Sequence, residues 1–238
     1  MSGIIEYYQH QSGRLFVVGD IHGCYDELMQ KLEVINFDFQ QDLLVAVGDL
    51  VDRGFESLKC LELIDEPWFK AILGNHEEMC ILSYGGDAMM QDIHARHGGE
   101  WFYALSEHQQ REVVEYCMRL PLVLEVSHQN KRYGFVHADI HQNHWNFFKQ
   151  ELEALNPLHG RVCRETALWG RSRVRNRPPE RYKTIQGIDA VFLGHTVVDL
   201  VTRRNNCYFI DTGGVFGMLL TVLEIDVNKS IEDQVIVI

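Results

Sequence analysis

Short apolar runs recur along the chain, and five of them end directly in a polar cluster. The runs lie at 15–18, 43–47, 71–73, 133–136 and 191–193. The clusters that follow them are GDIHG at 19–23, GDLVDRG at 48–54, GNHE at 74–77, HAD at 137–139 and GHT at 194–196. Each run has the length of a short buried strand, so each cluster is predicted to lie on the loop that leaves the carboxyl end of that strand.

Helical periodicity lies between the strands of the first half of the chain. Asp26 is predicted to cap a helix whose apolar face consists of Leu28, Met29, Leu32 and Ile35. A second helix is predicted after the second cluster, with Pro67 ending it. Strands that alternate with helices in this way predict the β-α-β-α-β arrangement of an α/β fold.

The segment 76–119 is predicted to be mostly helical, with breaks near 85–86 and 98–99. Its apolar stripe consists of Met89, Met90, Ile93, Trp101 and Phe102. The stripe indicates a helical cap packed on the core. Because the segment directly follows the third cluster, a lid that contacts the substrate is the alternative.

The second half of the chain is richer in strands. They are predicted at 122–126, 132–136, 190–193, 208–210, 218–225 and 234–238. A helix over about 146–155 and an arginine-rich loop separate two of them, and the scarcity of other helices favours antiparallel pairing. The sequence therefore predicts an α/β (α+β) fold with a central two-sheet β-sandwich flanked by α-helices, in one domain over 1–238.

Composition narrows the classes of partner. With 22 basic and 34 acidic residues the net charge is −12, which disfavours binding to nucleic acid or to an anionic membrane. The apolar runs are too short to span a membrane, and no secretory signal is recognised. Six scattered cysteines without a Cys-x-x-Cys pair are typical of reduced thiols, so a cytoplasmic protein is expected. The oligomeric state is not predicted.

The five clusters contain the ligand types of a two-metal hydrolytic centre, namely carboxylates, imidazoles and a carboxamide. Asp20 and His22 alternate along a segment expected to be extended, so both can face one ion. Asp49 can bridge two ions through its two oxygens. The second ion would be completed by Asn75, His137 and His195. At the fourth cluster Asp139, His141 and His144 compete with His137, which is preferred because it directly follows the strand.

This series of motifs resembles that of the calcineurin-like metallophosphoesterases, in particular the phosphoprotein phosphatase branch and its bacterial and phage lambda-type serine/threonine protein phosphatases. The resemblance runs from about 15 to 217. By matching motif positions it implies that one ion is held by Asp20, His22 and Asp49. The other would be held by Asp49, Asn75, His137 and His195.

The resemblance also implies roles for residues that are not metal ligands. His76 would be the general acid, oriented by Asp52, and Arg53 would bind the phosphate. A second phosphate-binding arginine is expected from the segment 161–183, which carries eight basic and two acidic residues. Arg171 best matches this position and Arg173 is its rival. The remaining arginines form either a solvated face or a docking strip for an acidic partner.

The implied activity is metal-dependent hydrolysis of phosphomonoesters, as a phosphoserine/phosphothreonine protein phosphatase acting on a phosphoprotein or phosphopeptide. A hydroxide bridging two divalent ions, expected about 3.5–4 Å apart, would attack phosphorus directly. Mn²⁺ is the expected metal, with Zn²⁺ or Fe²⁺ as alternatives. Two other functions stay open: a dinucleoside polyphosphate or cyclic-phosphodiester hydrolase with the same core, and an inactive scaffold that binds phosphoproteins.

Overall fold

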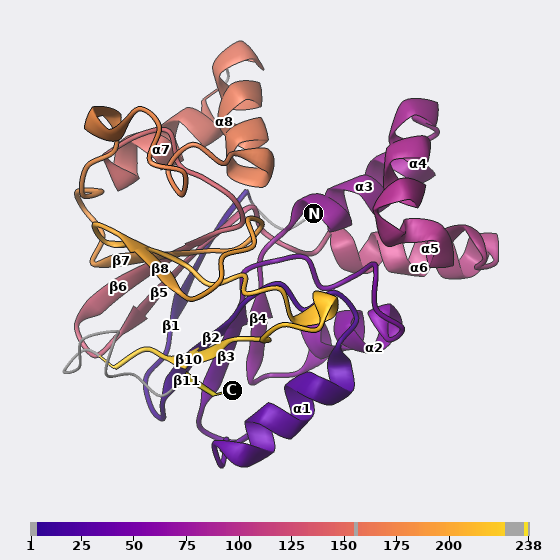
Figure 1. Cartoon of the computed structure of the whole chain (residues 1–238), viewed down its shortest axis with the longest axis horizontal. Coiled ribbons are helices and arrows are strands. Elements are labelled where there is room, and N and C mark those ends of the chain that lie inside the picture. The colour runs from indigo at the N-terminus through magenta and orange to yellow at the C-terminus, as the bar shows by residue number, and fades with distance from the viewer. Residues whose placement is uncertain (1–3, 155–156, 227–235, 238) are drawn as a thin grey trace.

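Two β-sheets lie at the centre of the computed structural model, which describes residues 4–154, 157–226 and 236–237 (Figure 1). Within that part of the chain, one sheet has five strands in the order β11-β10-β2-β3-β4, and the other has six in the order β1-β5-β6-β7-β9-β8. The first sheet contains β2 (Leu15–Val18), β3 (Leu43–Ala46), β4 (Phe69–Ala71), β10 (Val222–Glu224) and β11 (Ile236–Val237). The second contains β1 (Ile5–Gln9), β5 (Val123–His128), β6 (Lys131–Val136), β7 (Ala190–Leu193), β8 (Thr202–Arg204) and β9 (Cys207–Phe209).

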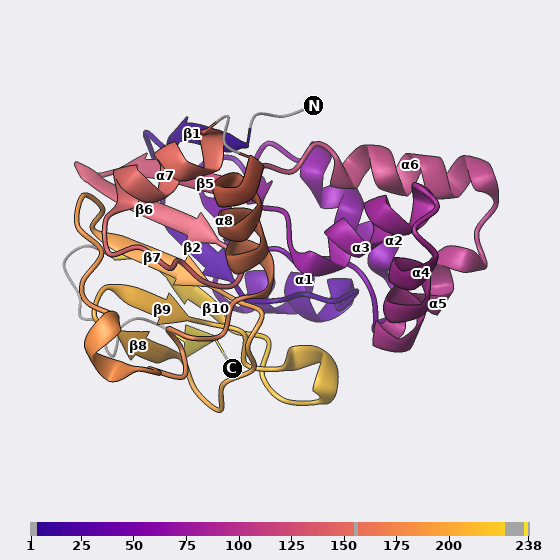
Figure 2. The ribbon, with the colours of Figure 1, turned by 90° about the horizontal axis from the view of Figure 1, so that it is seen from above.

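Helices flank the sheets in two groups, which Figure 2 shows from above. The first group consists of α1 (Tyr25–Val34), α2 (Ser57–Glu62), α3 (Asn75–Tyr84), α4 (Ala88–His94), α5 (Glu100–Tyr103) and α6 (Glu107–Cys117). The second consists of α7 (Trp145–Glu153) and α8 (Pro157–Trp169). Short 3-10 or π turns are η1 (Leu63–Asp65), η2 (Ala95–Gly99), η3 (Pro179–Arg181) and η4 (Gly214–Phe216). Among the described residues, no helix is long and apolar enough to cross a membrane.

Alternating side chains divide the core into two layers. Leu15 and Val45 of the first sheet share one buried cluster with Leu124 and Phe192 of the second. Neighbouring positions such as Phe16 point the other way and join a larger cluster that includes residues of the helices. A strand buried on both faces reads as a continuous apolar run, which is why these strands are recognisable in the sequence. The predicted two-sheet sandwich flanked by helices is confirmed.

Strand pairing in the second half differs from the prediction. β5 and β6 are antiparallel, but β6 pairs in parallel with β7, and β7 with β9. The β6–β7 connection contains both α7 and α8, which is enough chain for the crossover that parallel pairing needs. α8 lies where the sequence predicts an arginine-rich loop, and β1 and β8 are strands that the sequence pattern does not predict. These two strands lie at the edges of their sheet and are only partly buried, so their apolar pattern is weak.

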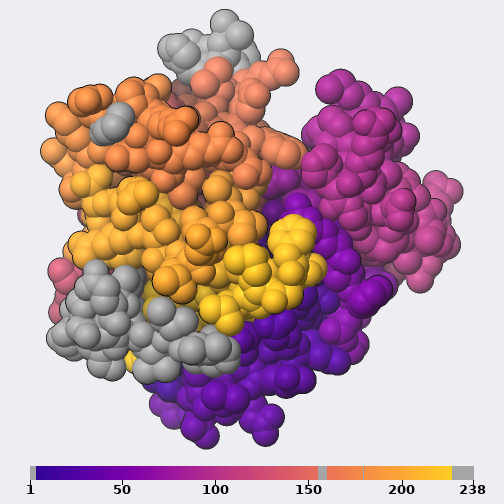
Figure 3. Space-filling view, viewed as in Figure 1, coloured from indigo at the N-terminus to yellow at the C-terminus, as the bar shows by residue number. Residues whose placement is uncertain are grey.

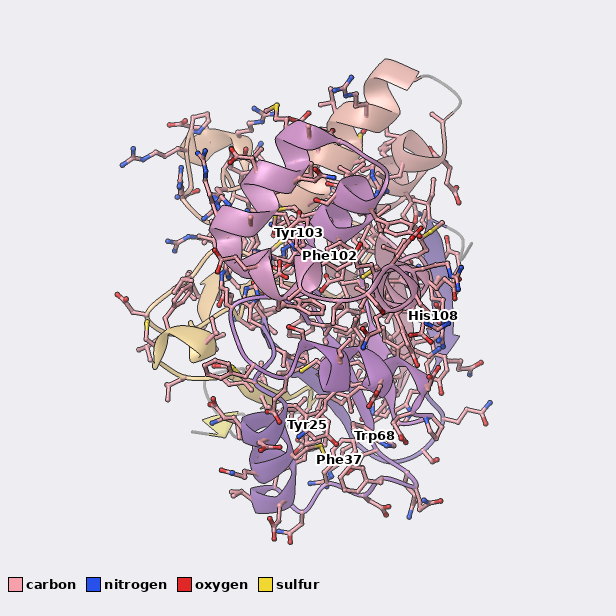
Figure 4. The ribbon with its side chains drawn as sticks, turned by 90° about the vertical axis from the view of Figure 1, so that its right-hand side faces the viewer. Tyr25, Phe37, Trp68, Phe102, Tyr103 and His108 are labelled. Atoms are coloured by element: carbon pink, nitrogen blue, oxygen red, sulfur yellow. The ribbon has the colours of Figure 1, made fainter. Side chains whose placement is uncertain are left out.

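Two local predictions in the helices are also wrong. α1 begins at Tyr25, so Asp26 lies in the first turn of the helix and is not its cap. Met89 is 75% exposed and does not belong to an apolar stripe, although Phe102 is buried. The cap segment consists of α3 to α6, which are called the cap helices below. In Figure 4 Phe102 and Tyr103 lie at the base of these helices, where both rings contact His94. The predicted strand 234–238 lies mostly outside the described residues.

Candidate active site

The five polar clusters meet at one edge of the two sheets. β2, β3 and β4 are parallel neighbours, as are β6 and β7, so the loops after their carboxyl ends leave on the same side. All six predicted metal ligands on these loops are buried, at 8% exposure or less: Asp20, His22, Asp49, Asn75, His137 and His195. Buried polar side chains of this density need partners or a cation.

Asp49 lies between two groups of nitrogen ligands. Its Oδ2 is 3.6 Å from His22 Nε2 and 3.9 Å from His76 Nε2, whereas its Oδ1 is 3.3 Å from His137 Nε2. His22, Asp49 and His76 form one group that could hold a metal ion, and Asp49, His137 and His195 form a second. The two oxygens of one carboxylate therefore face two separate groups, as a bridging ligand requires.

Asn75 connects the two imidazoles of the second group. Its Oδ1 lies 2.9 Å from His137 Nε2 and 2.8 Å from His195 Nδ1. His137 Nδ1 donates to the Val47 carbonyl at 2.8 Å, and its Nε2 faces the oxygens of Asn75 and Asp49. An arrangement in which several lone pairs converge is that of a metal site.

The backbone of the site is strained at the functional residues. His22, Asp49, Asp52, Arg53 and His195 all have positive φ angles, between 47° and 74°. Each such residue costs about 1–3 kcal/mol, which surrounding contacts must offset. The positive φ of His22 also means that the first cluster turns, so the predicted extended arrangement of Asp20 and His22 is wrong.

Glycines make the close approach of these loops possible. A Cβ on Gly74 would collide with Asp49 Oδ1, and one on Gly194 would collide with Asp20 Oδ1. Neither carboxylate could move away without leaving the centre of the site. The glycines of the motifs are therefore required by packing as much as by turn conformation.

Electrostatics at the site favour bound cations. Burial raises the pKa of Asp20 well above its ordinary value, and Asp211 and Asp49 raise it further. Burial lowers the pKa of His22 to about 3 and that of His195 to about 2, so both rings are neutral and keep a lone pair. The pKa of Asp49 lies well below its ordinary value: burial opposes this, but neighbouring imidazoles such as His137 outweigh it. Buried carboxylates together with imidazoles that keep a lone pair, such as those of His22 and His195, are the donor set that divalent ions stabilise.

Asp211 is a carboxylate of this site that the sequence analysis overlooked. It is 5% exposed, and burial together with Asp49 raises its pKa. Asp211 follows β9 and begins the cluster DTGG at 211–214. A sixth apolar run ending in a polar cluster could therefore have revealed it.

His76 and Asp52 form a buried dyad. His76 Nδ1 lies 2.6 Å from Asp52 Oδ2, and both side chains are at most 1% exposed. Asp52 also accepts hydrogen bonds from Trp101 Nε1 at 2.7 Å and from His94 Nε2 at 3.1 Å. Burial would raise the pKa of Asp52, but the hydrogen bonds from His76 and His94 outweigh it and lower this pKa to about 2. No local pattern in the sequence indicates a role for His94, because its partner lies 42 positions away.

We expect His94→Phe to lower kcat by about ten-fold or more, since a lost hydrogen bond to a charged group is worth about 1.5–3 kcal/mol and frees the carboxylate to rotate. Turnover of a phosphoserine peptide across pH would measure this, because its alkoxide leaving group needs the proton that His76 supplies. The matched control is Tyr103→Phe, which removes the hydroxyl 3.1 Å from His94 Nδ1 but leaves the Asp52 contact. An unchanged kcat and pH profile in His94→Phe would contradict a positioning role.

Glu77 joins the second and third clusters. Its carboxylate accepts backbone N–H groups from Asp49 at 2.9 Å, Leu50 at 2.7 Å and Gly74 at 2.8 Å. Burial and the nearby Asp49 raise its pKa to about 7. Glu77 thus holds the loop of Asp49 against the start of α3, a role that its place in the GNHE motif alone did not indicate.

The three candidate phosphate-binding arginines have different environments. Arg53 reaches His22 Nε2 and lies 2.9 Å from His76 Nε2. The Arg171 pKa is lowered by burial and by Arg175, and it also responds to Asp211, Asp20 and Arg53, so its guanidinium is close to the site. Arg173 is fully buried and donates to the carbonyls of Ile140, Gln142 and Lys183.

The rivals of His137 have other partners. Asp139 is buried and accepts N–H groups from Ser172 and Arg173 at 2.9 and 3.0 Å. His141 faces Glu151, and the ring of His144 packs on Phe147. The structure therefore brings His137 to Asp49 and Asn75 and leaves these three outside that group.

Comparison with known proteins adds independent information. The family model described as calcineurin-like phosphoesterase matches residues 13–199. Serine/threonine-protein phosphatase 1 of Salmonella typhimurium is 38% identical over 89% of this chain and 91% of its own length. The symmetrical bis(5'-nucleosyl)-tetraphosphatase of Pasteurella multocida is 30% identical over 82% of this chain and 67% of its own. A protein serine/threonine phosphatase structure from Saccharomyces cerevisiae superposes with a TM-score of 0.64 at 17% identity, covering 94% of this chain and 76% of that one.

Proposed function

Because this chain belongs to the calcineurin-like phosphoesterase family, we propose that it hydrolyses phosphoserine and phosphothreonine in proteins with two divalent metal ions. The observation that carries the proposal is the position of Asp49, whose two oxygens face separate ligand groups beside the His76–Asp52 dyad. The complete dyad and Arg53 argue against an inactive scaffold.

The residues present fit two divalent ions. Three buried carboxylates, Asp20, Asp49 and Asp211, lie close together: Asp49 raises the pKa of both Asp20 and Asp211, and cations would relieve this repulsion. We assign Asp20, His22 and Asp49 to one ion and Asp49, Asn75, His137 and His195 to the other. When bound, the ions supply a hydroxide nucleophile and neutralise charge on the phosphoryl oxygens. Mn²⁺ stays our expectation, because oxygen and imidazole ligands without a thiolate suit it.

Arg53, His76 and Arg171 act directly on the substrate, and Asp52 acts through His76. Arg53 binds two phosphoryl oxygens through its planar guanidinium, and the ring of Phe216, 5.2 Å from Cζ, supports that guanidinium from one side. His76 protonates the departing serine or threonine oxygen, while Asp52 holds the ring in the orientation that the transfer needs. Arg171 binds the phosphate from the opposite loop.

Arg171 and Arg173 should respond differently to mutation. We expect Arg171→Ala to lower kcat/KM by about 10²-fold or more without changing the Tm, because it removes a charged donor from the reacting phosphate. Arg173→Ala should instead lower the Tm, because it removes a buried side chain that donates to three carbonyls, one of them buried. Steady-state kinetics and thermal unfolding of both variants test this assignment. Normal kcat/KM in Arg171→Ala would exclude its role.

Protein substrates are favoured over dinucleotides by two observations. The Salmonella phosphatase is matched along 91% of its length, whereas the tetraphosphatase is matched along 67%. A groove of about 480 Å³ between the cap helices and α8 is lined by Leu82, Met90, Ile93, Arg161 and Trp169, among others. Figure 3 shows a notch between these two parts of the surface. The Trp169 ring lies 6.0 Å from that of His195, so the groove leads to the site and supports a cap that contacts the substrate.

The experiment that decides the substrate class is a comparison of four substrates with Mn²⁺ supplied. They are a phosphoserine peptide, a phosphotyrosine peptide, diadenosine tetraphosphate and a phosphodiester. We expect the highest kcat/KM for the phosphoserine peptide. A clear preference for diadenosine tetraphosphate would establish the alternative nucleotide hydrolase.

The exposed arginines after α8 are the candidate docking strip. Arg175, Arg177 and Arg181 are exposed, and each is free to contact an acidic segment flanking the phosphate. We expect the triple alanine variant to raise KM for acidic phosphopeptides and to leave KM for p-nitrophenyl phosphate unchanged. Equal KM values for acidic phosphopeptides in the variant and the original chain would leave these arginines as a solvated face.

A further inference from the structure

A second cluster of metal-ligating side chains lies outside the candidate active site. His141 Nε2 is 3.1 Å from Glu151 Oε2, and Cys163 Sγ is 3.8 Å from His141 Nε2 and 3.7 Å from Glu151 Oε2. One imidazole, one carboxylate and one thiol therefore converge on a common point. None of these residues takes part in the proposed reaction.

The spacing of the three atoms matches one face of a tetrahedral zinc site. Zn–S bonds of about 2.3 Å and Zn–N or Zn–O bonds of about 2.05 Å at tetrahedral angles separate S from N or O by about 3.6 Å, and N from O by about 3.4 Å. The observed separations, 3.8, 3.7 and 3.1 Å, lie within a few tenths of an ångström of these values. The three side chains need little movement to bind an ion.

The ligand types select a different metal from that of the active site. A thiolate with an imidazole and a carboxylate suits Zn²⁺, whereas the oxygen-rich active-site residues include no cysteine. The side chains of His141 and Glu151 are 22% and 33% exposed, so an ion can enter from solvent and keep a water as its fourth ligand. Gln142 Nε2 donates to Glu151 Oε2 at 2.8 Å and so orients the carboxylate. His141 Nδ1 has no hydrogen-bond partner in the described part of the chain, so the contacts of Nε2 with Glu151 and Cys163 orient the ring.

We propose that His141, Glu151 and Cys163 bind a Zn²⁺ ion that is separate from the catalytic ions. When the ion binds, the Cys163 thiol releases its proton to solvent. The resulting thiolate binds the ion together with the neutral His141 and the Glu151 carboxylate. The ion connects three segments: the loop after β6, α7, and α8, which packs against α7 (Figure 2).

Such a connection would fix the position of α8 relative to the active site. The Ala167 carbonyl of α8 accepts the Ala138 N–H at 2.7 Å, next to His137. Asp139 accepts the N–H groups of Ser172 and Arg173, which follow the helix. The zinc site thus holds α8, and Arg171 follows this helix in the chain. We assign the zinc ion a structural role at this position.

Cobalt spectroscopy tests the proposal independently of catalysis. Titrating Co²⁺ into the chelator-treated full chain should produce a thiolate-to-cobalt charge-transfer band in the near ultraviolet, which active-site ligands without sulfur cannot produce. The band should be absent in Cys163→Ser and retained in Cys207→Ser, a control that alters a buried cysteine in β9. Equilibration with Zn²⁺ followed by elemental analysis should find one zinc per chain fewer in Cys163→Ser.

A second variant keeps the test valid if Cys163→Ser does not fold. Glu151→Gln retains both the thiol and the size of the side chain, and it should weaken the Co²⁺ affinity measured from the band by about ten-fold or more. Absence of the band in the original chain, or its persistence in Cys163→Ser, would show that the three residues form only a hydrogen-bonded cluster. Neither outcome would affect the proposed phosphatase activity.

Discussion

His76→Asn is expected to lower kcat by about 10²–10⁴-fold while both metal ions stay bound. His76 Nε2 faces the reaction centre, and Nδ1 is occupied by Asp52 at 2.6 Å. Loss of the ring removes the proton donor for the leaving alkoxide, so the effect should be largest for phosphoserine and small for substrates with acidic leaving groups such as p-nitrophenol. Kinetics with both substrates and elemental analysis of the variant measure this.

Elemental analysis of His76→Asn also shows whether His76 is the general acid or a metal ligand. His76 Nε2 lies 3.9 Å from Asp49 Oδ2, near enough that His22, Asp49 and His76 also form a possible metal group. Asp52→Asn is the matched comparison, because it alters the dyad without touching that group. If His76→Asn loses metal and Asp52→Asn does not, His76 is a ligand and the acid must be sought elsewhere.

Asp49→Asn is expected to abolish activity together with binding of both ions. The substitution keeps the shape of the side chain but removes the negative charge shared by the two ligand groups, so each ion loses an anionic ligand. Asp20→Asn should weaken the binding of one ion more than the binding of the other. Metal content after gel filtration, together with kcat at increasing Mn²⁺, measures both effects.

Asp211→Asn is the control for the loss of a buried carboxylate near the metals. Asp211 Oδ1 accepts the Gly213 N–H at 3.0 Å, and we do not assign it to either ion. Its variant should retain metal better than Asp49→Asn does. Equal metal loss in the two variants would require Asp211 to be added to the ligands, and full metal retention in Asp49→Asn would exclude the bridging assignment.

Much of the site is predictable because its residues directly follow buried strands in the sequence. Asp49, for example, directly follows the buried run 43–47, and a polar residue after a strand can only lie at the strand's end. Parallel pairing then brings such ends to one edge of a sheet, so local pattern alone indicated which loops would meet. The apolar run 208–210 directly precedes Asp211, so the same local pattern also indicates Asp211.

Pairing directions and edge strands were harder to predict. β8 and β1 gain their stability from a neighbouring strand and carry little apolar signal of their own. The parallel pairing of β7 depends on a crossover through α8. The helical pattern of α8 is hard to recognise because the helix lies in an arginine-rich segment. Non-local pairing is decided by packing of the whole chain, which a short window of sequence does not contain.

The sequence by itself determined the fold class, the loops that carry the chemistry and the residue types available there, because buried strands and the polar residues after them follow from local hydrophobic pattern. Only the tertiary structure decided which of these groups contact one another. It placed His94 and Trp101 on Asp52 across 42 and 49 positions, and it buried Arg173 while leaving Arg171 near the carboxylates. Contacts between distant segments depend on how the helices pack, and side chains of the same type differ in role according to the partners that this packing provides.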